Sequence, residues 1–147
     1  MVRYLNSFLP NSFMFTYLTK GHRSIIYQGS FKGKKAIKKV EHTKAINRIQ
    51  NEIKYLKLLQ PYGFTPKLYK ESKNYFIAEY IQGQRIEDFL QTANKKKVPE
   101  IIKKILKQCR LLDKLHMDKK EMSNPYKHII IDKVPKMIDF ERVRFAM

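Results

Sequence analysis

The first part of the chain consists of short runs of β-branched and aromatic residues, with glycines between or beside them. Runs of this kind, bounded by turn residues, are typical of β-strands. Gly21, Gly29 and Gly33 punctuate the first three runs, as an antiparallel meander requires. The pattern predicts strands at residues 13–18, 24–28, 35–40, 67–70 and 75–80.

Between the third and fourth of these runs the hydrophobic period changes. Isoleucine and leucine recur every three or four residues, which places them on one face of a helix. This apolar face consists of Ile46, Ile49, Ile53, Leu56 and Leu59. We therefore expect a helix over residues 43–60 that ends at Pro61-Tyr62-Gly63.

The remainder of the chain is predicted to be mainly helical. A short helix is expected at residues 86–90, and a second helix begins near Pro99, a residue suited to the first turn. The apolar stripe of the second helix contains Ile101, Ile102, Ile105, Leu106, Cys109, Leu112 and Leu115. Residues 117–128 show no clean period and are expected to form a loop. A β-hairpin follows, in which Ile129-Ile130-Ile131 is the first strand.

Asp139 follows the second strand of this hairpin, in the segment Met137-Ile138-Asp139-Phe140-Glu141. A carboxylate at the end of a buried strand has two ordinary uses. It can cap a turn, or it can hold a divalent metal ion.

Composition sets the broad class. The chain has 147 residues, 43% of them apolar, which is enough for a hydrophobic core. Its single cysteine, Cys109, excludes an internal disulfide and a cysteine-based metal cluster. The sequence has no apolar run of about 20 residues, and its N-terminus does not have the pattern of a signal peptide. We therefore expect a cytoplasmic protein without a membrane partner.

The charge is strongly one-sided. Lys and Arg number 31 against 13 Asp and Glu, a formal net charge of +18. Such an excess favours a polyanionic partner such as a nucleotide, RNA or a ribosome surface. A lysine-rich solvated surface would give the same composition, and the sequence leaves both interpretations open.

The order of these elements resembles that of protein kinases. Lys35-Ala36-Ile37-Lys38 resembles the kinase Val-Ala-Ile-Lys motif, which places a lysine of the third strand against the ATP phosphates. Glu52, on the following helix, resembles the glutamate that pairs with this lysine. Gly21-His22-Arg23-Ser24, with Gly21 as its one glycine, resembles a reduced glycine-rich loop. Asp139-Phe140-Glu141 resembles Asp-Phe-Gly, whose aspartate coordinates magnesium.

The segment Glu79-Tyr80-Ile81 resembles the hinge whose backbone groups hold adenine. The similarity is greatest to the small atypical archaeal kinases of the RIO and KEOPS-associated type. It implies an α+β, protein-kinase-like fold. Residues 1–81 would form an N-lobe with a five-stranded antiparallel sheet and one helix, and residues 82–147 a reduced, mainly helical C-lobe. It also implies ATP and Mg²⁺ as cofactors and a minimal serine/threonine protein kinase as the function.

The catalytic loop departs from the family pattern and admits two registers. Kinases carry a catalytic aspartate and, five residues later, a metal-binding asparagine. Counting from Leu115-His116-Met117-Asp118 makes Asp118 the base and Asn124 an offset metal ligand. Counting back from the hairpin makes His128 the metal ligand and puts Ser123 at the catalytic position. Serine cannot act as an ionised base, so the two registers differ in the activity that they predict.

Two alternatives to an active kinase follow from these departures. The first is a pseudokinase that acts through a regulatory protein partner, with or without bound nucleotide. The second is a basic module that contacts RNA or the ribosome on an inherited kinase scaffold. An active kinase would instead act on a protein substrate.

Overall fold

The computed structural model describes residues 15–21, 23–42 and 47–146. The predicted strand start at residues 13 and 14, His22 of the predicted glycine loop, and the predicted helix start at residues 43–46 lie outside these ranges. Within them the protein has an α+β architecture with a five-stranded antiparallel sheet, in the order β1-β2-β3-β5-β4. These strands are β1 (Phe15–Lys20), β2 (Ser24–Phe31), β3 (Lys34–Glu41), β4 (Leu68–Glu71) and β5 (Tyr75–Glu79).

A two-residue turn fixes the register of β2 against β3. Lys32 and Gly33 both have positive φ, 48° and 78°, which is the conformation of a tight hairpin turn. Pairing then runs without a break from Phe31 opposite Lys34 to Ser24 opposite Glu41. Because side chains alternate along a strand, this register decides which residues of β3 face each side of the sheet.

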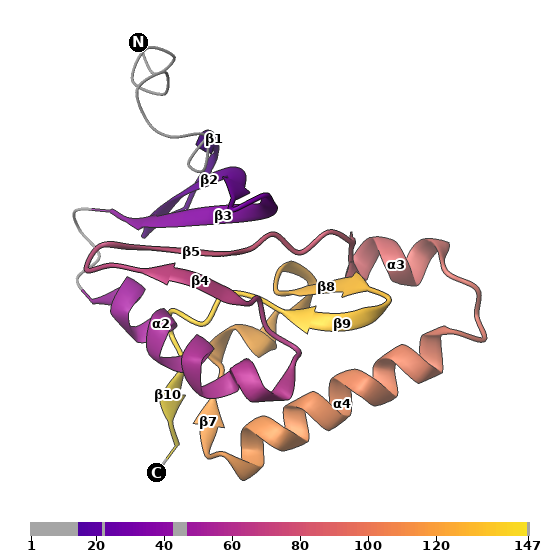
Figure 1. Cartoon of the computed structure of the whole chain (residues 1–147). Coiled ribbons are helices and arrows are strands. Elements are labelled where there is room, and N and C mark those ends of the chain that lie inside the picture. The colour runs from indigo at the N-terminus through magenta and orange to yellow at the C-terminus, as the bar shows by residue number, and fades with distance from the viewer. Residues whose placement is uncertain (1–14, 22, 43–46, 147) are drawn as a thin grey trace.

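Helix α2 (Arg48–Leu59) packs on one face of this sheet, as Figure 1 shows. Its buried residues include Ile49, Ile53 and Leu56, members of the predicted apolar face. A 3-10 turn, η1 (Gln60–Tyr62), follows it and ends at Gly63, whose φ of 75° suits glycine. The predicted end of the helix is therefore confirmed.

The second half contains α3 (Ile86–Thr92) and α4 (Val98–Lys114), close to the two predicted helices. The predicted hairpin is β8 (Ile129–Asp132) and β9 (Val134–Met137), and β6 (Gln84–Arg85) pairs with β8. Gly83 immediately precedes β6. A Cβ atom there would lie 2.3 Å from the Ile131 carbonyl oxygen, so only glycine fits this close approach.

The prediction of a loop at residues 117–128 is wrong in part. This segment contains the short strand β7 (Met117–Asp118) and the 3-10 turns η2 (Lys120–Ser123) and η3 (Pro125–Lys127). Strand β7 pairs with β10 (Arg144–Phe145), a distant segment whose proximity no local periodicity reveals.

One apolar core joins α2, the sheet and the second half of the chain. Its buried residues come from both sides of residue 81, among them Ile53, Phe76, Ile105, Ile129 and Phe140. Phe140 is fully buried, so the segment after β9 is fixed against α2. In the described part of the chain, no helix is both long and apolar enough to cross a membrane.

Candidate functional site

A cavity of about 450 Å³ lies between the large sheet and the second half of the chain. Five parts of the sequence bring side chains or backbone to its wall. Lys39 comes from β3, Glu52 from α2, His128 from the residue before β8, and Asp139 from the segment after β9. Residues 79–81, at the end of β5, form another wall.

Lys39 and Glu52 form a buried ion pair in this cavity. Their Nζ and Oε2 atoms are 2.7 Å apart, and the two side chains are only 7% and 4% exposed. The second oxygen of Glu52 accepts the backbone N–H of Phe140 at 3.2 Å. The pair therefore ties β3, α2 and the segment after Asp139 together.

The electrostatics favour a charged lysine. Burial alone would lower the pKa of Lys39, but the carboxylates of Glu52, Asp139 and Glu141 outweigh it and raise the pKa. Burial also raises the pKa of Glu52, and the charge of Lys39 opposes that shift. We assign the ionised pair because Glu52 accepts hydrogen bonds from both Lys39 and the Phe140 amide.

The expected pairing of Lys38 with Glu52 is wrong, and the lysine concerned is Lys39. Lys38 alternates to the opposite face of β3, where its Nζ lies 4.4 Å from the centre of the Tyr75 ring. The sequence could not distinguish the two because Ala36 and Ile37 are both apolar and two lysines follow them. Only the strand register resolves the choice.

Asp139 lies next to this pair in a rarely populated backbone conformation. Its φ is 67°, which a non-glycine residue adopts at some energetic cost. One carboxylate oxygen lies 3.4 Å from Lys39 Nζ and the other 3.5 Å from His128 Nδ1. The Lys119 ammonium donates to the Asp139 carbonyl at 2.6 Å and helps to hold this conformation.

Positive charge sets the protonation of Asp139. Burial of the carboxylate alone would raise its pKa. The charges of Lys39, Lys119 and His128 outweigh the burial, so the pKa of Asp139 is lowered. Asp139 is therefore an anion at neutral pH.

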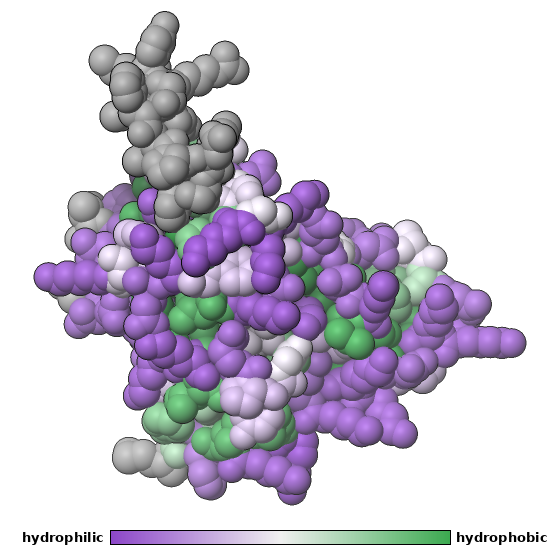
Figure 2. All heavy atoms as spheres, viewed as in Figure 1, coloured by the Kyte–Doolittle hydropathy of each residue, from purple (hydrophilic) through white to green (hydrophobic). Residues whose placement is uncertain are grey.

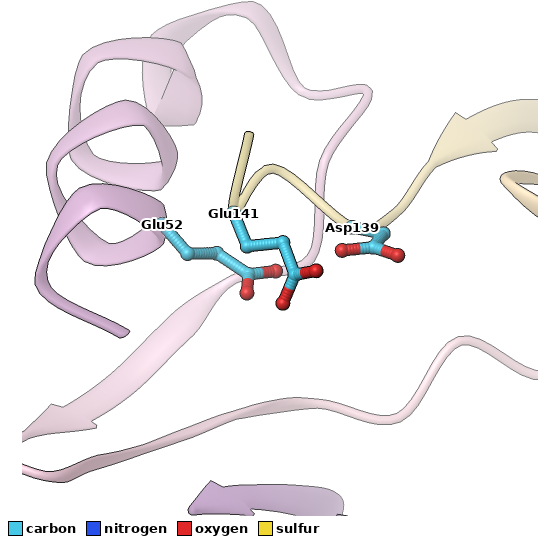
Figure 3. A group of neighbouring side chains, drawn as sticks. All are labelled: Glu52, Asp139 and Glu141. Atoms are coloured by element: carbon cyan, nitrogen blue, oxygen red, sulfur yellow. The ribbon is translucent and has the colours of Figure 1, made fainter. Parts of the chain in front are cut away.

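Three carboxylates lie close together, as Figure 3 shows: Glu52 from α2, and Asp139 and Glu141 from the segment after β9. One oxygen of each lies within 4.8 Å of the others. The Lys39 ammonium is 2.7, 3.4 and 3.8 Å from Glu52, Asp139 and Glu141 respectively. Glu141 also forms an ion pair at 3.2 Å with Arg23, the residue just before β2. Oxygen donors of this kind suit a hard divalent cation such as Mg²⁺.

The predicted hinge lines the same cavity. The Glu79 amide donates to the Lys67 carbonyl at 2.8 Å, and the Tyr80 amide donates to the Lys35 carbonyl at 3.2 Å. Ile81 is buried against the cavity. The Glu79 carboxylate is turned toward the Lys67 backbone and accepts its N–H at 3.1 Å. The segment is thus held by its neighbours on both sides.

Gly21 lies apart from these groups. Its amide donates to the Ser24 carbonyl at 2.9 Å and closes the turn between β1 and β2. The described residues that line the cavity from this region are Leu18 and Ile26, on the flanking strands.

Of the catalytic-loop residues that the sequence singled out, only His128 lines the cavity with Asp139. The Ile138 amide donates to the His128 carbonyl at 3.0 Å, which holds the two residues side by side. Asn124 is exposed and precedes η3. Ser123 is also exposed, and its hydroxyl donates to the Lys120 carbonyl at 3.3 Å.

Asp118 lies in β7, opposite Arg144 of β10. Its carboxylate forms ion pairs with Lys120 at 3.1 Å and Arg144 at 3.4 Å, and these contacts lower its pKa. It faces a second cavity of about 420 Å³, which Lys119 also lines. Since Lys119 contacts the Asp139 carbonyl, a single residue connects Asp118 to the neighbourhood of Asp139.

Sequence reasoning does not find Lys119, or the contact of Arg23 with Glu141. Lys119 and Arg23 are two of 31 lysines and arginines, and no local pattern distinguishes a buried cation from a solvated one. The Arg23–Glu141 contact spans 118 positions in the sequence.

Comparison of the sequence with known protein families finds no family that matches the chain, and comparison with curated proteins finds no match either.

Replacing Lys39 by methionine should destabilise the fold, because Glu52 would remain buried without its cation. Loss of one partner of a buried pair typically costs about 3–5 kcal/mol. The matched change Lys38→Met should cost far less, because Lys38 lies on the other face of the sheet. Urea unfolding measures both variants. The double change Lys39→Met/Glu52→Gln should recover most of the loss, whereas an equal loss in the double variant would exclude a buried ionised pair.

Asp139 should make stability depend on acidity. Its pKa in the folded state lies below the unfolded value of about 3.9, so the folded state binds fewer protons. Its contribution should be constant above about pH 5 and disappear as the pH falls through the folded pKa. The measurement is the difference in unfolding free energy between wild type and Asp139→Asn from pH 7 to pH 3. Asparagine tolerates positive φ, so a difference that grows with acid would contradict this assignment.

Proposed function

We propose that this protein is a minimal, atypical kinase-like phosphotransferase that uses ATP and Mg²⁺. The observation that carries the proposal is the position of Lys39. It lies on the third strand, pairs with a glutamate of the next helix, and contacts Asp139 after a later hairpin. In protein kinases a lysine of the third strand holds the nucleotide phosphates, a glutamate of the next helix orients that lysine, and an aspartate after a later hairpin holds Mg²⁺.

In this proposal Lys39 contacts the phosphates of the nucleotide. A lysine ammonium is a compact point charge on a flexible stem, so its direction must be fixed by a partner. Glu52 supplies that partner from a rigid helix, and its own position is fixed by the Phe140 amide. The adenine would lie against the backbone of residues 79–81, between apolar side chains such as Ile37 and Ile138.

Asp139 and Glu141 are the proposed Mg²⁺ ligands. Both are carboxylates, and each already lies within 4 Å of a cation, the Lys39 ammonium. Mg²⁺ prefers oxygen over nitrogen ligands, so His128 is better suited to orient Asp139 or to donate to a phosphate oxygen. Asn124 is exposed outside the cavity and is not proposed as a ligand. Bound Mg²⁺ would neutralise charge on the transferred phosphoryl group.

Asp118 is the proposed group that orients the acceptor hydroxyl of a serine or threonine in a protein substrate. It is a carboxylate of the loop that Lys119 joins to Asp139. The hydroxyl oxygen would form the new bond to phosphorus and give its proton to Asp118, while the bond from phosphorus to the ADP oxygen breaks. Ser123 has neither the charge nor the position for this role.

A nucleotide-binding pseudokinase is the second candidate. One observation favours it: Asp118 is held by two cations, Lys120 and Arg144. A carboxylate of lowered pKa in this arrangement accepts a proton weakly.

Binding of ATP tests the part that the two candidates share. Calorimetric titration with ATP and Mg²⁺ should give a measurable Kd for the wild type and for Lys38→Met. Asp139→Asn should weaken Mg²⁺-dependent binding at least tenfold, because a phosphate-bound cation loses its carboxylate. Lys39→Arg should weaken binding while retaining a cation in the pair. Equal affinity of all four proteins for ATP would refute the site.

Transfer of labelled phosphate separates the two candidates. An active kinase should phosphorylate itself or a generic protein substrate, and Asp118→Asn should lower the rate by about 10²-fold or more, in the range expected for a general base. Ser123→Ala should transfer at the wild-type rate. ATP binding without transfer in the wild-type protein would select the pseudokinase.

A further inference from the structure

Helix α4 carries a row of cations on its solvent side. Lys103, Lys107, Arg110 and Lys114 are spaced by four, three and four residues, which places them on one face of a helix. All four are exposed. At 1.5 Å per residue the row is about 16 Å long.

The described helix has two acidic residues. Glu100 lies one turn before Lys103, on the same face as the row, and Asp113 lies beside Lys114. Glu100 forms its ion pair with Lys104, which is not part of the row. In the ion pairs found among the described residues, the four cations of the row do not take part. Figure 1 shows α4 along one border of the molecule, and Figure 2 shows mostly hydrophilic residues over that region. Holding like charges in an unneutralised line costs energy, which a polyanion would offset.

The residues just before α4 extend this surface. Lys95, Lys96 and Lys97 are consecutive and exposed at the N-terminal end of the helix. The helix itself is rigidly placed, because Ile101 and Leu112 on its other side are buried in the main core.

We propose that this row, Lys103, Lys107, Arg110 and Lys114, binds the phosphate backbone of double-stranded RNA. A duplex offers dense, regularly spaced negative charge to a straight row of cations. A membrane surface fits less well, because a helix that lies in a lipid interface buries its apolar face there. Here that face is buried in the protein, and only Ile102 and Leu106 remain exposed among its large apolar residues.

The geometry of α4 also argues for a duplex of RNA. The described helix has no aromatic side chain on which unpaired bases could stack, so it lacks the platform that single strands use. The wide major groove of DNA keeps the phosphates of its two strands apart, so a straight row of cations on one helix face can follow the phosphates of only one groove edge. The narrow major groove of RNA brings phosphates of both strands close to such a row. This inference does not depend on the proposed nucleotide site.

The test is fluorescence anisotropy with a labelled RNA duplex of about 20 base pairs, measured over a range of salt concentrations. Replacing the four cations of the row by glutamine keeps a good helix former at each position. We expect affinity at low salt to fall at least tenfold. The slope of log affinity against log salt should decrease by about three to four, since each phosphate contact contributes about 0.9 in duplex DNA.

A charge-matched variant, in which Lys20, Lys35, Lys67 and Lys73 become glutamine, controls for net charge. These four lysines are exposed on other parts of the molecule, and the variant should stay within about threefold of wild type. Circular dichroism and thermal unfolding verify that both proteins fold. If both variants lost the same affinity for the RNA duplex, net charge alone would explain the loss and the proposal would be overturned. Tighter binding to a DNA duplex, to single-stranded RNA or to anionic lipid vesicles would overturn it as well.

Discussion

The buried ion pair between Lys39 and Glu52 is the contact on which the arrangement of the candidate site depends. It joins the third strand to α2, and through the second oxygen of Glu52 it also fixes the Phe140 amide. Burying two charges is costly unless each finds its full set of partners. Here the lysine has three carboxylates within 4 Å. A buried ion pair adds little stability compared with apolar residues of the same size, so function explains its presence in the core better than stability does.

The sequence predicted the elements well where the pattern is local. Strands β1 to β5, α2 and the β8–β9 hairpin follow from periodicity and turn residues, and Glu52 and Asp139 line the same cavity from α2 and from the segment after β9. The motif resemblance points to Lys38 and not to Lys39, because strand register is a property of paired strands and the composition around residues 36–39 does not reveal it. Strand β7 was missed for a similar reason, since its partner β10 lies more than twenty residues further along the chain.

The segment between β7 and β8 shows why counting along the sequence leaves two registers open. Asp118 lies in β7, and His128 directly precedes β8. Two 3-10 turns fill the stretch between them, so neither Asn124 nor Ser123 reaches the cavity. A spacing rule taken from other proteins fails wherever a loop has a different length, although its ends stay in place.

The two-residue turn at Lys32 and Gly33 has a consequence for how this chain tolerates change. Adding one residue there would slide β3 by one position and bring Lys38 to the side of the sheet where Lys39 now lies. A lysine would still face Glu52 after this shift, because Lys38 would replace Lys39. The small Ala36 and the larger Ile37 would exchange faces at the same time. The packing of Ala36 and Ile37, and not the position of the charge, therefore specifies which of the two lysines faces Glu52.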